Sequence, residues 1–388
     1  MGREICVKEE LKDFGNGAEK LIGDLIVKKI PLKIGINSVH KKWEIFSTIN
    51  RAAFNSDYIE GTTKILIYLG KKVSSADRIF SRIEQNTADN LVRIFDKIFE
   101  NSLKIAKRNG RFSRPVYIAI DIHEIPYYGD INKLPVSGGK HKSGTSYFMK
   151  YATVCILHKG ERFTIAAVPF PLLENKLEIV KNLIKISIKR VKIKIVFLDR
   201  GFRSIDIINF LESKNLRYIM PIQKDKKVNR IVNRKKKFPS CFDYEIGKKE
   251  RKCKVKMIVI KKRVEKKVEK ENKEKVKKFI FITNMKVESA VEALEITELY
   301  RKRWGIETSY RKKKEFRINT TSTSYNVRVF FFLYSVALYN IWVLSNLLIV
   351  LTEKVTFLPE KPKFSSKMFK TILYLSTFDF FRINEIKE

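Results

Sequence analysis

The sequence predicts an α/β fold in which a mixed β-sheet is flanked by helices. Between residues 116 and 222, short apolar runs of strand length alternate with longer segments of helical period. This order is typical of a sheet whose strands are connected by helices. The length of 388 residues also predicts two or three domains, at roughly 150 residues per domain.

The charge balance predicts a polyanionic partner. Lys and Arg number 80 against 42 Asp and Glu, which leaves a formal net charge of +38. Double-stranded DNA is the partner we favour, because phosphates bound by Lys and Arg release counterions. An anionic membrane surface is the rival partner. A compositional bias of the genome or of growth temperature explains many lysines, but not an excess of this size over acids.

The cysteines and the N-terminus bear on the cellular compartment. Cys6, Cys155, Cys241 and Cys253 form no C-x-x-C pair, so neither a zinc site nor a disulfide framework is indicated. The first residues contain no apolar stretch of signal-peptide length. We therefore expect a cytoplasmic, DNA-associated protein.

Residues 1–110 are predicted to form a helical DNA-binding region. A helix should begin near Thr87, because apolar residues recur there at helical spacing. A second helix should begin near Ala76 after a glycine break, capped by a serine. Its polar face carries Arg78, Arg82 and Gln85. The pair of helices before Thr87 fits a helix-turn-helix, and an ordinary helical hairpin fits it equally well.

Residues 111–222 supply the first part of the predicted sheet domain. Strands are expected at 116–121, 145–158, 162–170, 194–199 and 217–222, with helices at 172–191 and 204–216. Residues 223–285 then form a β-rich insertion with strands at 253–260 and 278–283. The nearly all-charged run between these strands, residues 261–278, is predicted to be a solvated loop or a frayed helix.

Residues 286–350 are predicted to complete the sheet domain, and residues 351–388 to form a C-terminal helical tail. Residues 329–351 are apolar apart from two serines and two asparagines, and are long enough to span a bilayer. Two asparagines near mid-membrane and basic segments on both sides argue against a span. We expect a buried core helix and no membrane partner.

Two predicted strands end in an aspartate, Asp121 and Asp199. The carboxyl ends of strands in open α/β sheets are where active sites gather. A strand-terminal Asp is also commonly a helix cap or a turn former, so either residue alone is weak evidence for catalysis.

A helix that begins near residue 287 carries a third acid, Glu307. Tyr300, Arg303 and Lys314 share its face, within an arc of about 60° at about 100° per residue. A solvent-facing stripe of salt bridges is the alternative. Three acids brought together would repel one another unless a cation neutralised them. Mg²⁺ or Mn²⁺ suits such oxygen ligands, and two ions together can serve phosphoryl transfer.

Three segments carry a family resemblance. Tyr300, Arg303, Glu307 and Lys314 match the signature Y-x-x-R-x-x-x-E-x-x-x-x-x-x-K at every spaced position. LDRGF at 198–202 and AIDIHEIPYYG at 119–129 resemble the motifs of a second and a first catalytic aspartate. Over residues 115–346 the chain resembles the DDE transposases of bacterial and archaeal insertion sequences, in the group with the Y-R-E-K signature.

The resemblance implies a fold and a set of roles. It implies a ribonuclease-H-like sheet with the first Asp on the first strand, the second Asp after the fourth strand, and the Glu on a later helix. Asp121, Asp199 and Glu307 would be the catalytic metal ligands. Tyr300, Arg303 and Lys314 would contact DNA near a 5′ phosphate at the transposon end. Trp304 would stack on a flipped base, although a core position suits it at least as well.

The resemblance is incomplete after the first aspartate, where relatives often have Thr or Ser and this chain has His123. Strand alternation places His123 on the same face as Asp121. Asp130 and Glu124 are alternatives to Asp121, with Glu124 expected to point to the other face. Lys140 and Lys142, in the loop of residues 137–146, are expected to contact the DNA backbone or to form a solvated turn.

The implied activity is strand cleavage and strand transfer at the inverted repeats of an insertion sequence, by a homodimer assembled on DNA. Two alternatives stay open. One is a transposase-derived DNA-binding protein that has lost catalysis, and the other is a ribonuclease-H-like nuclease without strand transfer.

Overall fold

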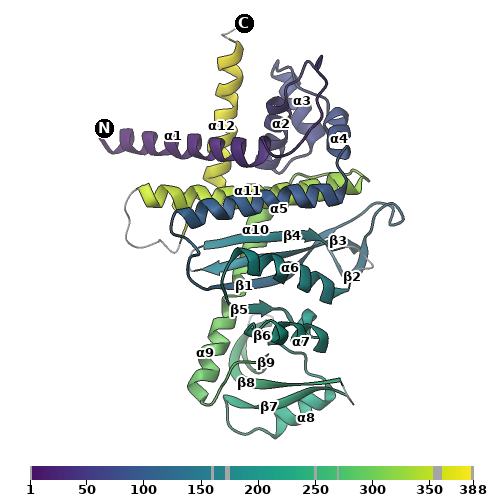
Figure 1. Ribbon diagram of the computed structural model, residues 1–388, viewed down its shortest axis with the longest axis vertical. Helices are drawn as coiled ribbons and strands as arrows, with labels where there is room; N and C mark the ends of the chain where they lie inside the picture. The colour runs from purple at the N-terminus through teal and green to yellow at the C-terminus, as the bar shows by residue number, and fades with distance from the viewer. Residues whose placement is uncertain are drawn as a thin grey trace.

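A computed structural model describes residues 2–158, 161–170, 175–248, 251–268, 271–352 and 361–385. It confirms the α/β class: one mixed sheet is flanked by helices (Figure 1). The strands are β1 (Val116–Pro126), β2 (Ser137–Lys142), β3 (Thr145–His158), β4 (Glu161–Pro169), β5 (Ile193–Leu198), β6 (Tyr218–Pro221), β7 (Ser240–Lys248), β8 (Arg251–Val268) and β9 (Glu271–Thr283).

The central strands have the order β4-β3-β1-β5-β6. β1 pairs antiparallel with β3, and β3 pairs antiparallel with β4. β1 pairs parallel with β5, and β5 with β6. This arrangement is consistent with the ribonuclease-H-like domain that the resemblance implied, with the first acid on β1 and the second directly after β5. Every strand predicted between residues 116 and 222 is present. The predicted end of the first strand at Asp121 was wrong, because β1 stays paired with β3 as far as Pro126, so Asp121 lies within the strand.

The predicted β-rich insertion consists of α8 (Lys226–Arg234), β7, β8 and β9. β9 pairs antiparallel with β6, so the insertion extends the same sheet to its far edge (Figure 1). The prediction of a loop or frayed helix for residues 261–278 was wrong. β8 and β9 stay paired from Lys261 opposite Lys278 out to Val268 opposite Glu271. The ladder continues through the charged run because main-chain hydrogen bonds do not depend on the side chains.

Helices cover both faces of the sheet. α6 (Lys176–Arg190) and α7 (Ile205–Ser213) pack on one face, and α9 (Ala290–Arg301) and α10 (Trp304–Lys314) on the other (Figure 1). The alternation along β1 shows this directly, because Ile118 and Ile120 join the core under α6 while Ala119 joins the core under α9 and α10. The sheet is therefore buried on two sides, which explains its apolar strands.

α5 (Ala88–Arg108) and α11 (Tyr325–Thr352) lie side by side along β4 (Figure 1). α11 is the one described helix long and apolar enough to cross a membrane, but 94% of its apolar window is buried inside the protein. Asn340 is fully buried and bonds the main chain of Thr164 twice, accepting from its N–H at 3.0 Å and donating to its carbonyl at 2.7 Å. The expected core helix is confirmed.

The N-terminal region is helical, as predicted. It comprises α1 (Gly2–Ile22), a π-helical turn at Gly23–Val27, α2 (Lys42–Asn55), α3 (Ile59–Tyr68) and α4 (Ala76–Glu84). The C-terminal α12 (Ser366–Glu385) packs against α1 and α2. Thr87 caps α5 by accepting from the Asn90 N–H at 3.2 Å. The division of the chain into domains stays a prediction.

The predicted helix pair before α5 is present as α3 and α4. Gly70 has a φ of 75° in the connection, a conformation that glycine adopts freely. Ile79 and Ile83 face inward and are fully buried, and Arg78 is exposed. A helix-turn-helix role for this pair stays a prediction.

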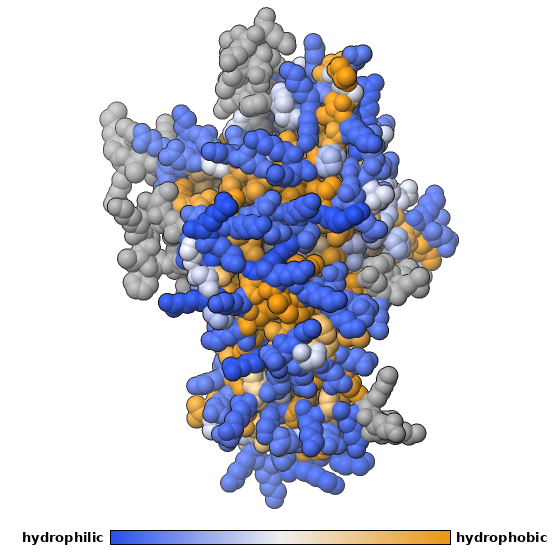
Figure 2. Space-filling model, viewed as in Figure 1, coloured by the Kyte–Doolittle hydropathy of each residue, from blue (hydrophilic) through white to orange (hydrophobic). Residues whose placement is uncertain are grey.

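Hydrophilic side chains cover most of the face drawn in Figure 2, as the composition requires. The exposed apolar residues of α3, among them Ile67 at 59%, interrupt this cover. A highly charged surface of this kind repels other copies and attracts polyanions.

Candidate active site

Asp121 and Asp199 are brought together by the parallel pairing of β1 and β5. Ile120 is paired with Leu198, so the two aspartates are the next residues on neighbouring strands. The Asp199 carboxylate also accepts a hydrogen bond from the Arg200 N–H at 2.7 Å, at the start of the 3₁₀ turn Arg200–Phe202. Asp199 therefore has the capping role considered from the sequence, and this bond holds its side chain at the start of the turn.

The electrostatics of Asp121 show that the predicted acids act on one another. The pKa of Asp121 is raised to about 6, chiefly by burial and further by the carboxylates of Asp199 and Glu307, while the Arg303 guanidinium opposes the rise. A neighbouring carboxylate has this effect only at short range. Asp121, Asp199 and Glu307 thus share one electrostatic environment around Arg303.

Arg303 and Glu307 form an ion pair inside this environment, with Nη2 and Oε1 2.7 Å apart. The Arg303 side chain is only 10% exposed, whereas that of Glu307 is 53% exposed. Burial lowers the pKa of Arg303, but Tyr300 and the three carboxylates outweigh it, so the pKa is raised overall. Arg303 is therefore a fixed positive charge among the acids.

Two tyrosines bond the main chain next to the two aspartates. The Tyr300 hydroxyl donates to the Leu198 carbonyl at 3.1 Å, directly before Asp199. The Tyr310 hydroxyl donates to the carbonyl of Asp121 itself at 3.1 Å and lies 2.6 Å from the Thr153 hydroxyl. Both rings are buried. These bonds favour a positioning role for Tyr300, and its predicted contact with DNA stays a prediction.

Tyr310 was missed from the sequence. It lies three residues after Glu307 on α10, and the helical-face argument could have found it there. Lys313 was also missed. It is 3% exposed, donates to the Cys155 sulfur at 3.4 Å, and lies 4.6 Å from the Tyr310 ring centre. Burial lowers the pKa of Lys313.

The single helix predicted from about residue 287 is in fact two helices, α9 and α10. Hydrogen bonds between residues three apart span the junction, including Arg303 N–H to Tyr300 carbonyl and Ile306 N–H to Arg303 carbonyl. This is the tighter spacing of a 3₁₀ turn. Gly305 allows the close approach there, because a Cβ at that position would lie 2.8 Å from Arg162 Nε. Lys314 is exposed beyond the junction.

His123 shares the face of Asp121, as predicted. Its ring stacks on Tyr310 with centroids 4.5 Å apart and on the other side faces Phe332 at 6.2 Å. The pKa of His123 is lowered to about 3, first by burial and then by the lysines and arginines around it. His123 is therefore a neutral, stacked ring at neutral pH.

The alternatives to Asp121 lie elsewhere. Glu124 points away from α10 and pairs with Lys142 at 3.1 Å and with Lys150 at 3.5 Å. Asp130 lies in an exposed turn, where it accepts from the Asn132 N–H at 3.0 Å.

The remaining predicted DNA contacts come from three places. Lys140 and Lys142 are exposed on β2, in a hairpin closed by Ser143 and Gly144 with φ values of 53° and 78°. Arg78 and Arg82 lie on α4 in the N-terminal region, and Arg82 Nη2 donates to the Ser38 hydroxyl at 3.2 Å. The side chain of Trp304 lies outside the described residues.

The donor chemistry suits a hard divalent cation. Asp121 and Asp199 follow paired residues of neighbouring strands, and their carboxylate oxygens are the ligands that Mg²⁺ and Mn²⁺ prefer. Among the described residues, no three His, Cys, Asp or Glu side chains lie close enough together to hold one ion. Glu307 is paired with Arg303 and has not joined the aspartates.

The segment that carries this geometry matches a known protein family. Residues 113–341, more than half of the chain, match the family described as Transposase DDE domain. No curated protein matches the chain. The match does not distinguish the Y-R-E-K group, so membership of that group stays a prediction. The matched segment contains Asp121, Asp199 and Glu307, and the chain therefore belongs to the family of transposases with a DDE domain.

Proposed function

We propose that this transposase cleaves DNA at the inverted-repeat ends of its own insertion sequence and joins the freed 3′ ends to target DNA. The observation that carries the proposal is that Asp121 and Asp199 directly follow the paired residues Ile120 and Leu198 on the parallel strands β1 and β5, inside the family segment. Glu307 lies within electrostatic reach of Asp121. The catalytic acids proposed are therefore Asp121, Asp199 and Glu307.

Mg²⁺ or Mn²⁺ is the proposed cofactor, with two ions held by Asp121, Asp199 and Glu307. When bound, such ions activate the attacking oxygen and stabilise the leaving oxygen of a phosphoryl transfer. The raised pKa of Asp121 fits a site built for added positive charge. Glu307 is half exposed, so its side chain is free to exchange its ion pair with Arg303 for a place beside the aspartates.

The residues around the acids have proposed roles in holding DNA. Arg303 partly neutralises the acids in the free protein, and it is available to a phosphate once Glu307 turns away. Lys314 is exposed on the same helix and would bind the DNA backbone. Tyr300 and Tyr310 hold the main chain at Leu198 and Asp121, which keeps the acids in register.

More distant basic residues are proposed to extend the DNA contact. Lys140 and Lys142 project from an exposed hairpin, and Arg78 and Arg82 from α4. Both transposon ends must be processed together, so we propose a homodimer assembled on double-stranded DNA, and a cytoplasmic location with the DNA.

The test is cleavage of a duplex that carries the terminal repeat of the element, in Mg²⁺ or in Mn²⁺. Asp121→Ala, Asp199→Ala and Glu307→Ala should each abolish strand cleavage while they largely preserve binding to the duplex. Asp206→Asn is the matched control, because Asp206 is exposed on α7 outside the site. It should cut as the parent does.

Two results would contradict the proposal. If all three alanine variants cut the duplex normally, the acids are assigned wrongly. If the parent cuts but never joins the freed 3′ end to a second duplex, the protein is a nuclease without strand transfer.

A further inference from the structure

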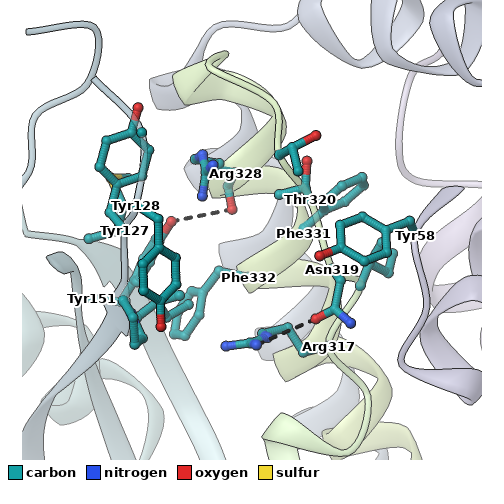
Figure 3. Close-up of a pocket in the computed structure, with 16 residues that line it drawn as sticks. Tyr58, Tyr127, Tyr128, Tyr151, Arg317, Asn319, Thr320, Arg328, Phe331 and Phe332 are labelled. Atoms are coloured by element: carbon teal, nitrogen blue, oxygen red, sulfur yellow. Dashed lines mark hydrogen bonds between the residues drawn. The ribbon is translucent and has the colours of Figure 1, made fainter. Parts of the chain in front are cut away.

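A cavity of about 340 Å³ lies beside the candidate active site (Figure 3). Five parts of the chain form its walls: the end of β1 with the residues that follow it, β3, the connection between α10 and α11, the start of α11, and the residue before α3. Its size is within the range of roughly 300–1,000 Å³ found for small-molecule sites. None of the roles proposed above uses it.

Two arginines give the cavity a positive charge without a matching acid. Arg317 and Arg328 line it and are partly buried, and burial lowers the pKa of each. Among the described residues, neither forms an ion pair with a carboxylate. Arg317 donates to Asn319 Oδ1 at 3.4 Å, and Arg328 Nε donates to the Ser322 carbonyl at 2.6 Å. A half-buried cation without a counterion is a site for an anion.

Aromatic rings form the rest of the walls. Figure 3 shows Tyr58 on one side of the cavity and Tyr127, Tyr128 and Tyr151 on the other, with the Arg317 side chain crossing below them. Tyr58 and Tyr128 are 42% and 70% exposed, so their faces are accessible. Flat rings with open faces are the surface on which nucleic-acid bases stack.

The cavity is linked to the catalytic acids. Phe332 in its wall stacks on Tyr151 at 3.8 Å and faces His123, whose ring stacks on the Tyr310 that bonds Asp121. Along β1, Ile125 in the wall is four residues beyond Asp121, a separation of about 13 Å at roughly 3.3 Å per residue. That is the length of about four nucleotides of a duplex strand.

We propose that this cavity binds one nucleotide, with its phosphate at Arg317 and its base against Tyr58 and Tyr128. A phosphate joined to a base could come from an unpaired nucleotide of the DNA strand or from a free nucleotide. The position beside the acids and the charge of the protein assign it to the strand. This assignment rests on the proposed function, since it makes the cavity a subsite for the DNA that the acids cut.

The experiment measures nucleotide binding directly on the full chain. An octathymidylate with a 5′ fluorescein is titrated by anisotropy, and the same oligonucleotide with 5-iodouracil is photocrosslinked and the modified peptides are mapped. Tyr128→Ala and Arg317→Gln should each weaken binding by roughly 5- to 150-fold, the range expected for loss of one base stack or one charged contact. Crosslinks should map to Tyr58 or Tyr128.

Matched controls replace residues of the same kind outside the cavity. Phe279→Ala removes an aromatic ring that is 39% exposed on β9, and Arg234→Gln removes an exposed arginine on α8. Both should bind as the parent does. Tyr128 is largely exposed, so its variant keeps the test valid even if Arg317→Gln fails to fold.

The competitor separates the two sources. If thymidine monophosphate displaces the octathymidylate only at concentrations far above those of unlabelled octathymidylate, the strand is the ligand. Equal potency of the two competitors overturns the assignment to the strand. Crosslinks confined to residues outside the cavity, or parent-like binding by both variants, overturn the site itself. A protein that crosslinks at Tyr128 but cuts no DNA would retain the site and lose the proposed function.

Discussion

Replacement of Asp121 by Asn should stabilise the metal-free protein at neutral pH, which is the opposite of the usual effect of a mutation in a packed site. The pKa of Asp121 is raised from 3.8 to about 6, first by burial and then by Asp199 and Glu307, against the effect of Arg303. The folded chain therefore binds a proton more tightly than the unfolded chain. Its ionised carboxylate costs free energy of folding.

The size and pH dependence of this cost follow from the two pKa values. A rise from 3.8 to about 6 corresponds to about 3 kcal/mol at pH 8, where Asp121 is ionised in both states. The cost falls to about 1 kcal/mol at pH 4.5 and vanishes below the unfolded pKa. Stability from this group is thus present at low pH and is lost as the pH rises through about 6.

The assay is urea unfolding of the parent and of Asp121→Asn, in buffer with a chelator, at pH 8 and at pH 4.5. The variant should gain up to about 3 kcal/mol at pH 8 and about 1 kcal/mol at pH 4.5. Mg²⁺ should stabilise the parent and not the variant. Asp206→Asn, at an exposed position on α7, should change neither value.

The reasoning is refuted if Asp121→Asn is less stable than the parent at pH 8, or if its gain is the same at both pH values. The first result would show that the carboxylate makes more favourable contacts than its raised pKa implies. The second would show that the effect does not come from ionisation.

Two further predictions concern the surroundings of the site. Arg303→Met removes the main effect that lowers the pKa of Asp121, so the pH at half-maximal cleavage should rise. Arg303→Lys keeps the positive charge and should leave this pH nearer to that of the parent. A pH–rate profile that shifts equally for both variants would contradict this prediction. Asn340→Ala leaves the buried main chain of Thr164 without two hydrogen bonds. The free energy of unfolding, measured in urea, should fall by about 2–4 kcal/mol. A fall of less than about 1 kcal/mol would show that α11 is not held by this contact.

The strand positions were predictable because they depend on local pattern. Each apolar run predicted as a strand between residues 116 and 222 formed one, and Asp121 and Asp199 became neighbours as soon as β1 and β5 paired in parallel. The register of that pairing is not written in either strand alone. β5 ends directly before Asp199, whereas β1 continues past Asp121 to Pro126, so the pairing of the strands and not their ends brings the two acids together.

The charged run at residues 261–278 was predicted wrongly because side-chain composition says little about main-chain pairing. β8 and β9 were already paired by their apolar residues, such as Ile258 with Phe281. The ladder then continued outward at little extra cost in chain entropy. The charged composition led to the prediction of a solvated loop or frayed helix and did not predict that the backbone forms paired strands.

The sequence by itself determined the α/β class, the positions of the strands between residues 116 and 222 and the buried core helix α11, since period and spacing are local properties of the chain. Only the tertiary structure decided where long-range contacts fall: the 3₁₀ junction that splits α9 from α10, the burial of Lys313, and the bond from Tyr310 to Asp121. These contacts join residues far apart in the chain, and their energies depend on burial, which no local pattern contains.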